Sequence, residues 1–411
     1  MGSTVLAAAM DELVARLAEV DPGKFPYAEV LKEFRRVGKH FVSKELLGAL
    51  DAVRRRLAGR PTTQDRLLGR FLDCALDKWD GRYDYSTYVG LTLLPLPDGG
   101  DPWRALVRRD RLHLLLVTDA LRFEIAAADG RTDALPRLRP TGRMLTKRCR
   151  LGNRAVGREL GHFHVADVEV ATDPIGVSRQ LCEAVMASAS RDELRYLELS
   201  MLPVYVVHDE YLFIRVLQAF EATFALMAVQ LSAVVRALAA GDGRGAVDAL
   251  KAAETALRGA APLFALLATM QVPAFRTFRQ FTEGASAIQS ENYKILEAFC
   301  RKPDPQRLES AAYGSVPEIR RRVMDGISNI DETLLAARAS GRLTKPAGDE
   351  VATAMADFEA AIKLWRRTHH RLAVRMLGDR PGTGYTEGTR YLEHAIDVPV
   401  FLATGESEGR R

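Results

Sequence analysis

DEYLFIRVLQAFEATFALMAVQLSAVVRALAA, residues 209–240, is the stretch that decides the fold class of this chain. Its apolar residues recur three and four positions apart, which is the spacing that buries one stripe of an α-helix. Alanine, leucine, arginine and glutamate also dominate the rest of the sequence, and all four favour helix. The sequence therefore predicts an all-α protein.

The helical period extends outward from this segment in both directions. Helices are expected at about 1–20, 104–129, 244–270, 284–302, 315–340 and 348–377, with two more before residue 80. Prolines and glycines between 95 and 102 predict a loop. The segment 137–172 has the weakest helical period, and its alternating stretch predicts an irregular insertion with a short hairpin. We therefore expect an N-terminal helical extension, residues 1–80, and a helical body, residues 81–411.

Composition and charge argue against several classes of function. The net charge of +5, from 58 basic and 53 acidic side chains in 411 residues, is small and dispersed, so nucleic-acid binding is not indicated. The four cysteines form no CxxC or Cys/His pair, which argues against a zinc site or a disulfide framework. We find no signal peptide and no apolar run near the roughly 20 residues of a membrane span. A cytoplasmic protein without nucleic-acid or membrane partners is expected.

The chemically most informative segment lies near the C-terminus. WRRTHH, residues 365–370, falls within an expected helix, and Gly382-Thr383-Gly384 follows it. Taken alone, a histidine pair on an arginine-rich helix is more often a surface feature than a metal site. The glycines follow a helix rather than a strand, which argues against a dinucleotide-binding loop. A tight turn that brings backbone and the Thr383 hydroxyl close to a ligand explains them better.

The whole string WRRTHHRLAVRMLGDRPGTGYTEGTRYL, residues 365–392, resembles the signature of the tryptophan 2,3-dioxygenase superfamily. In that pattern a tryptophan precedes the haem-ligating histidine by four residues, and the threonine of a GTG loop follows fourteen residues later. The resemblance implies that His369 is the axial ligand of haem iron. It also implies that Trp365, Gly382 and Gly384 contact the haem. A neutral imidazole suits this role and leaves the opposite face of the haem free.

A second block, Phe278-Arg279 followed by GASAIQS and by residues 293–297, is similar to the FR…SGFQS…LE segment of the family. The resemblance implies that Arg279 clamps the substrate α-carboxylate, for which a guanidinium is well shaped. The alternative is that Arg279 only decorates a helix surface.

A third block, HDEYLFI from His208, is similar to the family's HDE..FI helix start, and Tyr85-Ser86-Thr87-Tyr88 is a weaker match to a YG.YL segment. The resemblance implies that Phe213 lines the substrate pocket. The local alternative is a capped helix, because Asp209 and Glu210 lie where acidic groups favour a helix N-terminus. Both interpretations can hold together.

The sequence also departs from the dioxygenase pattern. Leu217 occupies the position of the distal histidine, and Tyr385 replaces the fourth residue of the GTGG loop. The segment that begins at Met201 resembles more closely the haem-dependent aromatic oxygenases, a branch that works in natural-product biosynthesis. Some members of that branch tether haem through a cysteine four residues after the axial histidine. Ala373 stands there in this chain, so covalent attachment is not expected.

Together these resemblances imply a monooxygenase or peroxygenase that binds haem b without a covalent bond and uses O₂ or H₂O₂ to hydroxylate tyrosine or a substituted tyrosine. The substrate contacts would be Arg279, Thr383, Phe213, Leu217 and Tyr385. His208 is the candidate distal acid–base residue, with His162 and His164 as alternatives. Other possibilities are a tryptophan or indole oxygenase or dioxygenase of the same fold, and a haem-binding protein without turnover. A homo-oligomer is expected.

Overall fold

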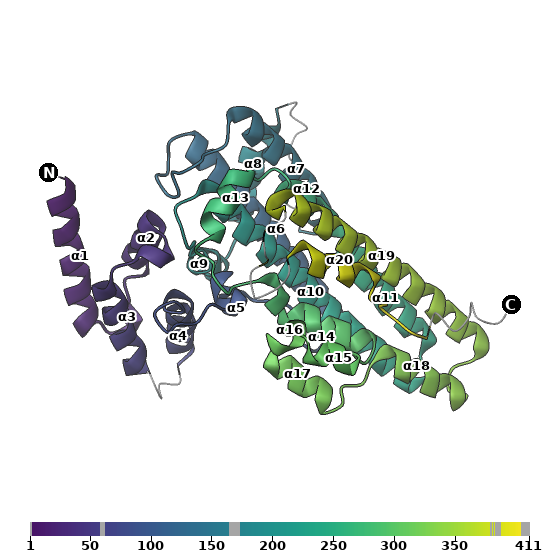
Figure 1. Ribbon diagram of the computed structural model, residues 1–411. Coiled ribbons are helices and arrows are strands. Elements are labelled where there is room, and N and C mark those ends of the chain that lie inside the picture. The colour runs from purple at the N-terminus through teal and green to yellow at the C-terminus, as the bar shows by residue number, and fades with distance from the viewer. Residues whose placement is uncertain are drawn as a thin grey trace.

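The computed structural model describes residues 2–57, 62–163, 173–378, 380, 382 and 388–403, with side chains from residue 7 onward. Within these ranges every regular element is a helix, and the only strand-like contact is one isolated bridge between Arg137 and Val207. Figure 1 shows long helices side by side in the body and the first helices set apart at the N-terminal end. The all-α prediction is confirmed.

The α-helices run as follows: α1 (Gly2–Glu19), α2 (Tyr27–Val37), α3 (Lys44–Leu57), α4 (Thr63–Ala75), α5 (Tyr85–Tyr88), α6 (Pro102–Ala128), α7 (Gly142–His162), α8 (Pro174–Ala187), α9 (Arg191–Leu199), α10 (His208–Ala240), α11 (Gly243–Gly259), α12 (Ala261–Leu267), α13 (Val272–Arg279), α14 (Glu291–Cys300), α15 (Pro305–Glu309), α16 (Ala311–Gly314), α17 (Pro317–Met324), α18 (Ile330–Ala339), α19 (Lys345–Leu377) and α20 (Thr389–Asp397). Short 3₁₀ helices are η1 (Pro22–Lys24), η2 (Lys39–Phe41), η3 (Leu91–Leu93) and η4 (Ala287–Gln289).

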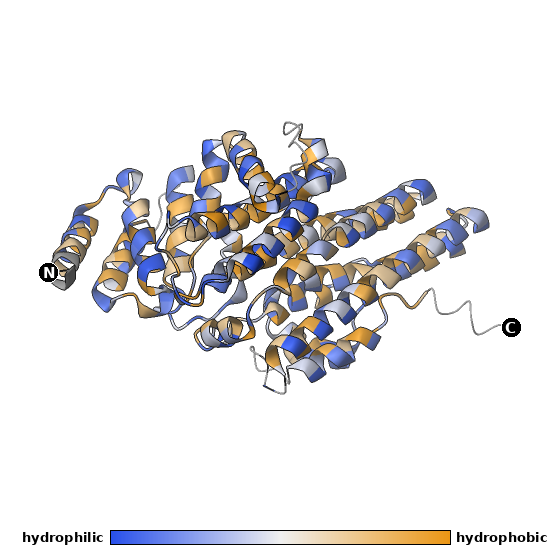
Figure 2. Cartoon of the chain, turned by 90° about the horizontal axis from the view of Figure 1, so that it is seen from above, coloured by the Kyte–Doolittle hydropathy of each residue, from blue (hydrophilic) through white to orange (hydrophobic). Residues whose placement is uncertain are grey.

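Helix α10 is the centre of the body and packs against α6, α11 and α14, while α19 packs against α11 and α20. It ends at Gly241, whose φ of 77° is the left-handed conformation that glycine adopts without strain. Figure 2 shows hydrophobic and hydrophilic residues mixed along every body helix, as expected where each helix buries one face. The long helices thus form a layered core around α10.

Helices α1–α4 share a hydrophobic core of their own. Leu17, Phe34, Leu46 and Phe71 are fully buried in it. The same cluster continues into the body through Leu93, Leu199 and Leu202. The division of the chain near residue 80 stays a prediction.

The irregular insertion expected within 137–172 is instead a regular helix over much of its length, because α7 occupies Gly142–His162. The alternating stretch on which the short hairpin was expected, residues 163–170, lies outside the described residues after Phe163. The Thr141 side chain caps α7 by accepting a hydrogen bond from the Met144 amide. Gly152 weakens the helical period of the sequence, but in the structure it allows α7 to pack closely against α6. A Cβ at Gly152 would lie 2.7 Å from a methyl carbon of Leu121 on α6.

Two expected helices are broken in the structure. The segment 244–270 divides at Ala260, and Pro262 lies in the first turn of α12. The segment 315–340 divides into α17 and α18, and Gly326 between them has a φ of 96°. Periodic apolar residues continue through both breaks, so the period alone did not reveal them.

Helix α10 is the one described helix that is long and apolar enough to cross a membrane by length and composition, with a window of mean hydropathy 1.7. The expectation that no stretch approaches a span was therefore too strict. Of that window, 61% is buried inside the protein, as in the core helix of a soluble protein.

Acid is expected to unfold the protein through its buried carboxylates. Burial raises the pKa of Asp119, but Arg215 and Arg122 outweigh burial and lower it to about 2. The pKa of Glu297 is likewise lowered to about 2 against the effect of burial, by Lys294, Arg307 and Arg366. Both groups bind protons more readily in the unfolded chain, where their pKa values are near 3.8 and 4.5.

Their stabilisation is therefore complete above about pH 5 and is lost as the pH falls toward 2, at up to about 1.4 kcal/mol per pH unit for each group. Urea unfolding at pH 6, 4 and 3 measures this slope. Asp119→Asn should flatten it, whereas the exposed control Asp357→Asn should leave it unchanged. An identical slope for Asp119→Asn would contradict the prediction.

Candidate functional site

A cavity of about 260 Å³ lies among α5, α10, α13, α14, α19 and α20. Most of its wall is aromatic or aliphatic, including Phe213, Leu217, Phe220, Phe224, Phe264, Leu267, Met270, Trp365 and Leu372. Such a largely apolar cavity with a few polar groups is typical of a ligand site. We treat it as the candidate functional site.

The cavity face of α19 carries Trp365, His369, Leu372 and Met376. These residues are three or four positions apart, which places them on one side of a helix. His370 is one position away and does not line the cavity. The structure therefore separates the two adjacent histidines by the helix face that each occupies.

The His369 imidazole lies in an apolar setting. Its ring centre is 5.2 Å from that of Trp365 and 6.3 Å from that of Phe264. Burial lowers the pKa of His369 to about 4, and the nearby His370 adds a smaller effect in the same direction. His369 is therefore neutral at physiological pH, which is the form of imidazole that ligates metals.

Trp365 completes an aromatic wall beside His369. Its ring is stacked 5.5 Å from Tyr293 and meets the edge of Phe224 at 5.3 Å. Its indole Nε1 is buried and has no hydrogen-bond acceptor among the described residues. Buried donors are normally paired, so a group bound in the cavity is a natural source of the missing acceptor.

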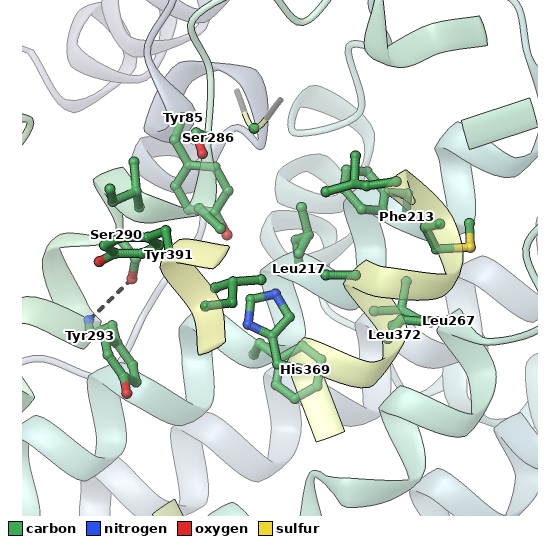
Figure 3. Close-up of a pocket in the computed structure, with 18 of the residues that line it drawn as sticks. Tyr85, Phe213, Leu217, Leu267, Ser286, Ser290, Tyr293, His369, Leu372 and Tyr391 are labelled. Carbon is green, nitrogen blue, oxygen red and sulfur yellow. Dashed lines mark hydrogen bonds between the residues drawn. The ribbon is translucent and has the colours of Figure 1, made fainter. Parts of the chain in front are cut away.

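The two sides of His369 differ in polarity, as Figure 3 shows. Tyr85, Ser286, Ser290 and Tyr391 lie on one side of the imidazole, while Phe213, Leu267 and Leu372 lie on the other. A bound molecule would thus meet hydroxyl groups on one side and mainly apolar side chains on the other.

A buried charged cluster forms part of the cavity wall and was not anticipated from the sequence. The Glu297 carboxylate lies 3.2 Å from Lys294, 2.6 Å from Arg307 and 3.4 Å from Arg366. Three cations thus surround one carboxylate. The i,i+3 spacing of Lys294 and Glu297 was the one local signal available, because Arg307 and Arg366 come from other helices.

Arg279 lines the cavity at the C-terminal end of α13 and is half-buried. Burial lowers its pKa, and the charge of Arg380 adds to this effect. Phe213 on α10 packs against α13, and its ring centre lies 5.7 Å from that of Phe275 and 5.2 Å from that of Phe278. Phe213, Leu217, Arg279, Trp365, His369 and Gly382 all line this one cavity. Thr383, Gly384 and Tyr385 lie outside the described residues.

His208 does not line the cavity. Its Nε2 lies 3.1 Å from Glu124 on α6, its ring is 4.8 Å from Phe123, and it is 1% exposed. Five positions along a helix amount to about 140° of rotation, so His208 and Phe213 cannot share a face. The distal role expected for His208 is not supported by its location.

The alternative histidines do not replace it. His162 contacts Asp110 at 3.0 Å, and 48% of its side chain is exposed at the surface. His164 lies outside the described residues.

The residues present fit haem as a bound group. Among the described residues, no three or more His, Cys, Asp and Glu side chains are grouped so that they could hold a bare metal ion. His369 can instead supply one axial bond to a metal that brings its other ligands with it, as haem iron does. The aromatic wall and the unpaired Trp365 indole suit a flat, largely apolar group with polar edges.

Fold and site together define the class: an all-α protein with one neutral histidine facing an aromatic cavity. No family profile matches the chain. It is 28% identical over 223 residues to the tryptophan 2,3-dioxygenase of Anaeromyxobacter sp. (strain K), covering 47% of this chain and 84% of the relative. It is 25% identical over 232 residues to the tryptophan 2,3-dioxygenase of Polaromonas sp. (strain JS666 / ATCC BAA-500), covering 48% and 79%. These similarities, at 24–28% identity over about half of the chain, support the tryptophan 2,3-dioxygenase superfamily.

Proposed function

We propose that the protein is a haem-dependent oxygenase that acts on a free aromatic amino acid. The observation that carries this proposal is the neutral His369 in an aromatic cavity of a chain whose relatives are named tryptophan 2,3-dioxygenase. Bound haem would supply the oxygen-activating chemistry, with O₂ as the oxidant. The protein contributes the axial imidazole, a cavity that excludes bulk water and the groups that orient the substrate.

His369 would hold the iron, and Trp365 and Gly382 would contact the macrocycle. Ala373, one turn after His369, lines the cavity and offers no thiol for a covalent tether. We therefore propose non-covalent haem b. The sequence resemblance alone supports Gly384 as a haem contact. It alone also supports Thr383 and Tyr385 as substrate contacts.

Two ring chemistries remain as candidates within this function. Tryptophan oxygenation agrees with the names of the relatives. Hydroxylation of tyrosine or a substituted tyrosine in natural-product biosynthesis is the second candidate, and Leu217 favours it. Leu217 lines the cavity where the resemblance to ring-cleaving enzymes implies a histidine, and its side chain can neither donate nor accept a proton.

Product analysis of the haem-loaded protein distinguishes these candidates. The protein is mixed with tryptophan or tyrosine, either under oxygen-labelled O₂ with a reductant or with oxygen-labelled peroxide. Mass spectrometry then measures the masses of the products. Gain of two labelled oxygen atoms by tryptophan supports dioxygenation, and gain of one by tyrosine supports hydroxylation. Haem-loaded protein that yields no product with either substrate would indicate a haem-binding protein without turnover and would contradict the proposal.

Arg279→Ala is expected to weaken binding of the aromatic amino acid while haem content stays unchanged. A carboxylate that enters an apolar cavity loses its hydration, and a charge-assisted pair with a guanidinium offsets that loss. Truncating one partner of such a pair costs about 2–5 kcal/mol, which is tens-fold to thousands-fold in affinity. Titration of the haem Soret band with the amino acid measures the change.

Two variants serve as comparisons for this experiment. Arg276 lies one turn earlier on α13, where its Nε donates to the Met376 carbonyl, so Arg276→Ala should bind the amino acid normally. If Lys294→Met loses binding instead and Arg279→Ala does not, the carboxylate is held by the charged cluster around Glu297. If no variant matters, the ligand is not an α-amino acid.

The partners proposed for the chain are this small molecule and further copies of itself. Association into a homo-oligomer is carried over from the family resemblance and stays a proposal.

A further inference from the structure

Glu221 is a buried carboxylate in the wall of the cavity for which the sequence analysis found no role. It lies on α10 one turn after Leu217 and two turns after Phe213, so the three side chains share one face of the helix. All three line the cavity, and Glu221 is 1% exposed. The four-residue spacing from Leu217 was the signal that could have identified it.

The Glu221 carboxylate is held by a neighbouring amide. The Asn292 side-chain amide donates to Oε2 at 2.8 Å, and Ser290 and Tyr85 are close enough to lower the pKa of the carboxyl group. An ionised carboxylate accepts about four hydrogen bonds, so acceptor capacity remains for a ligand. Ser290 and Tyr85 lie on the polar side of His369 in Figure 3.

No cation offsets the charge of Glu221 within the described part of the chain. Other buried carboxylates there have cationic partners: Asp77 with Lys39, Asp119 with Arg215, Glu124 and Asp209 with Arg148, Glu159 with Arg109, and Glu297 with Lys294. Glu210 and Asp331 also lack a salt bridge, but Glu210 accepts from the Val204 and Tyr205 amides and from Tyr88. Asp331 accepts from the Leu402 and Ala403 amides, and neither carboxylate lines the cavity. Glu221 therefore combines an uncompensated buried charge with access to a ligand.

We propose that Glu221 is the counter-ion for a protonated amine of the bound ligand. The identity of that amine, the α-ammonium group of an aromatic amino acid, rests on the proposed function. An ammonium group supplies both the missing positive charge and a donor for the remaining acceptor position. In a cavity of low dielectric such a pair is worth more than in water, and the loss of one partner leaves a costly buried charge.

Binding of the amine should lower the pKa of Glu221. Burial raises this pKa, and Asn292, Ser290 and Tyr85 offset the rise only in part. An adjacent ammonium group favours the ionised carboxylate and lowers the pKa again. Further titratable or charged groups line the same cavity: Tyr85, Tyr88, Arg279, Tyr293, Lys294, Glu297, Arg307, Arg366, His369 and Tyr391. Outside the cavity, Glu291 adds to the rise.

The test compares aromatic amino acids with analogues that lack the amine, using the haem-loaded protein. Tryptophan and tyrosine are titrated beside indole-3-propionate and 3-(4-hydroxyphenyl)propionate into the wild type and Glu221→Gln. Glu221→Gln should weaken binding of the amino acids by about tenfold or more, the expected size for losing a charged hydrogen bond, and should change the deaminated analogues little. Glu291→Gln removes the same charge from an exposed position nearby and should change neither.

Several outcomes would overturn the proposal. Equal loss for the amino acids and the deaminated analogues would make Glu221 a structural residue. If the loss of binding in Glu221→Gln follows the ring hydroxyl or the indole N–H of the ligand instead of the amine, Glu221 binds the aromatic ring.

If amino acids and propionates all fail to bind the wild type, titration with tyramine and tryptamine distinguishes failure of the proposed function from failure of the counter-ion role of Glu221. Binding of these amines that depends on Glu221 supports the counter-ion while the proposed function fails, and no binding of any amine overturns both. Thermal unfolding and the Soret intensity show whether Glu221→Gln is folded and loaded.

Calorimetry of the wild type needs no variant and keeps the proposal testable if Glu221→Gln does not fold. The affinity for tryptophan and tyrosine should fall, relative to that for the deaminated analogues, as the pH is lowered, because a protonated Glu221 lacks the charge that pairs with the ammonium group. The same pH dependence for both sets of ligands would contradict the counter-ion role.

Discussion

Replacing His369 by alanine is expected to abolish stable haem binding. The imidazole is the one histidine side chain among the described residues that line the cavity, and burial holds it in the neutral form that ligates iron. No other described side chain of the cavity wall offers an equivalent axial nitrogen. The measurement is the haem content of purified or reconstituted protein, from the Soret band and the haem-to-protein ratio.

His370→Ala is the matched control, because it removes the same side chain from the next position of the same helix. It should retain haem, since His370 does not line the cavity. Added imidazole should restore part of the haem binding of the His369 variant, because the small molecule can enter the space that the side chain leaves. Loss of haem in His370→Ala with normal haem in His369→Ala would reverse the assignment.

Replacing Arg148 by methionine is expected to destabilise the fold by about 3–5 kcal/mol, which is typical of breaking a buried ion pair from one side. Arg148 is fully buried on α7 and donates to Glu124 at 2.7 Å and to Asp209 at 2.7 Å. Its Nε also donates to Thr269 at 3.1 Å. Without the guanidinium, two carboxylates remain buried, and only His208 is left beside Glu124.

Urea unfolding at pH 7 measures this loss, and Arg122→Met provides the comparison. Arg122 pairs with Asp119 at 2.7 Å, but 56% of its side chain is exposed and Asp119 keeps Arg215 as a partner. Its replacement should therefore cost much less. An Arg148→Met protein within about 1 kcal/mol of the wild type would show that the buried carboxylates become protonated at little cost.

Sequence reasoning was reliable where the interactions are local. The 3.6-residue period predicted α10 and α19 with bounds close to those observed, because the pattern that forms a helix is contained within the helix. The same period places Trp365 and His369 on one face of α19, and this face lines the cavity.

Local pattern was not sufficient for α7, where an irregular segment was expected. Glycine weakens a helix considered alone, but Gly152 lets α7 approach Leu121 of α6 more closely than a Cβ would permit. The contact that makes the glycine useful is with another helix, so the segment itself carries no sign of it. The burial gained by close packing outweighs the low helix propensity.

The sequence by itself determined the helical class and the two long helices, since each depends on residues within a few turns of one another. The choice of His369 over His370 came from the family resemblance. Only the tertiary structure decided which polar residues meet at the cavity. Packing turned His208 toward Glu124, gathered Arg307 and Arg366 around Glu297, and set Glu221 in the wall without a cation. These partners come from different helices, and the charge balance of a cavity depends on how helix faces pack together.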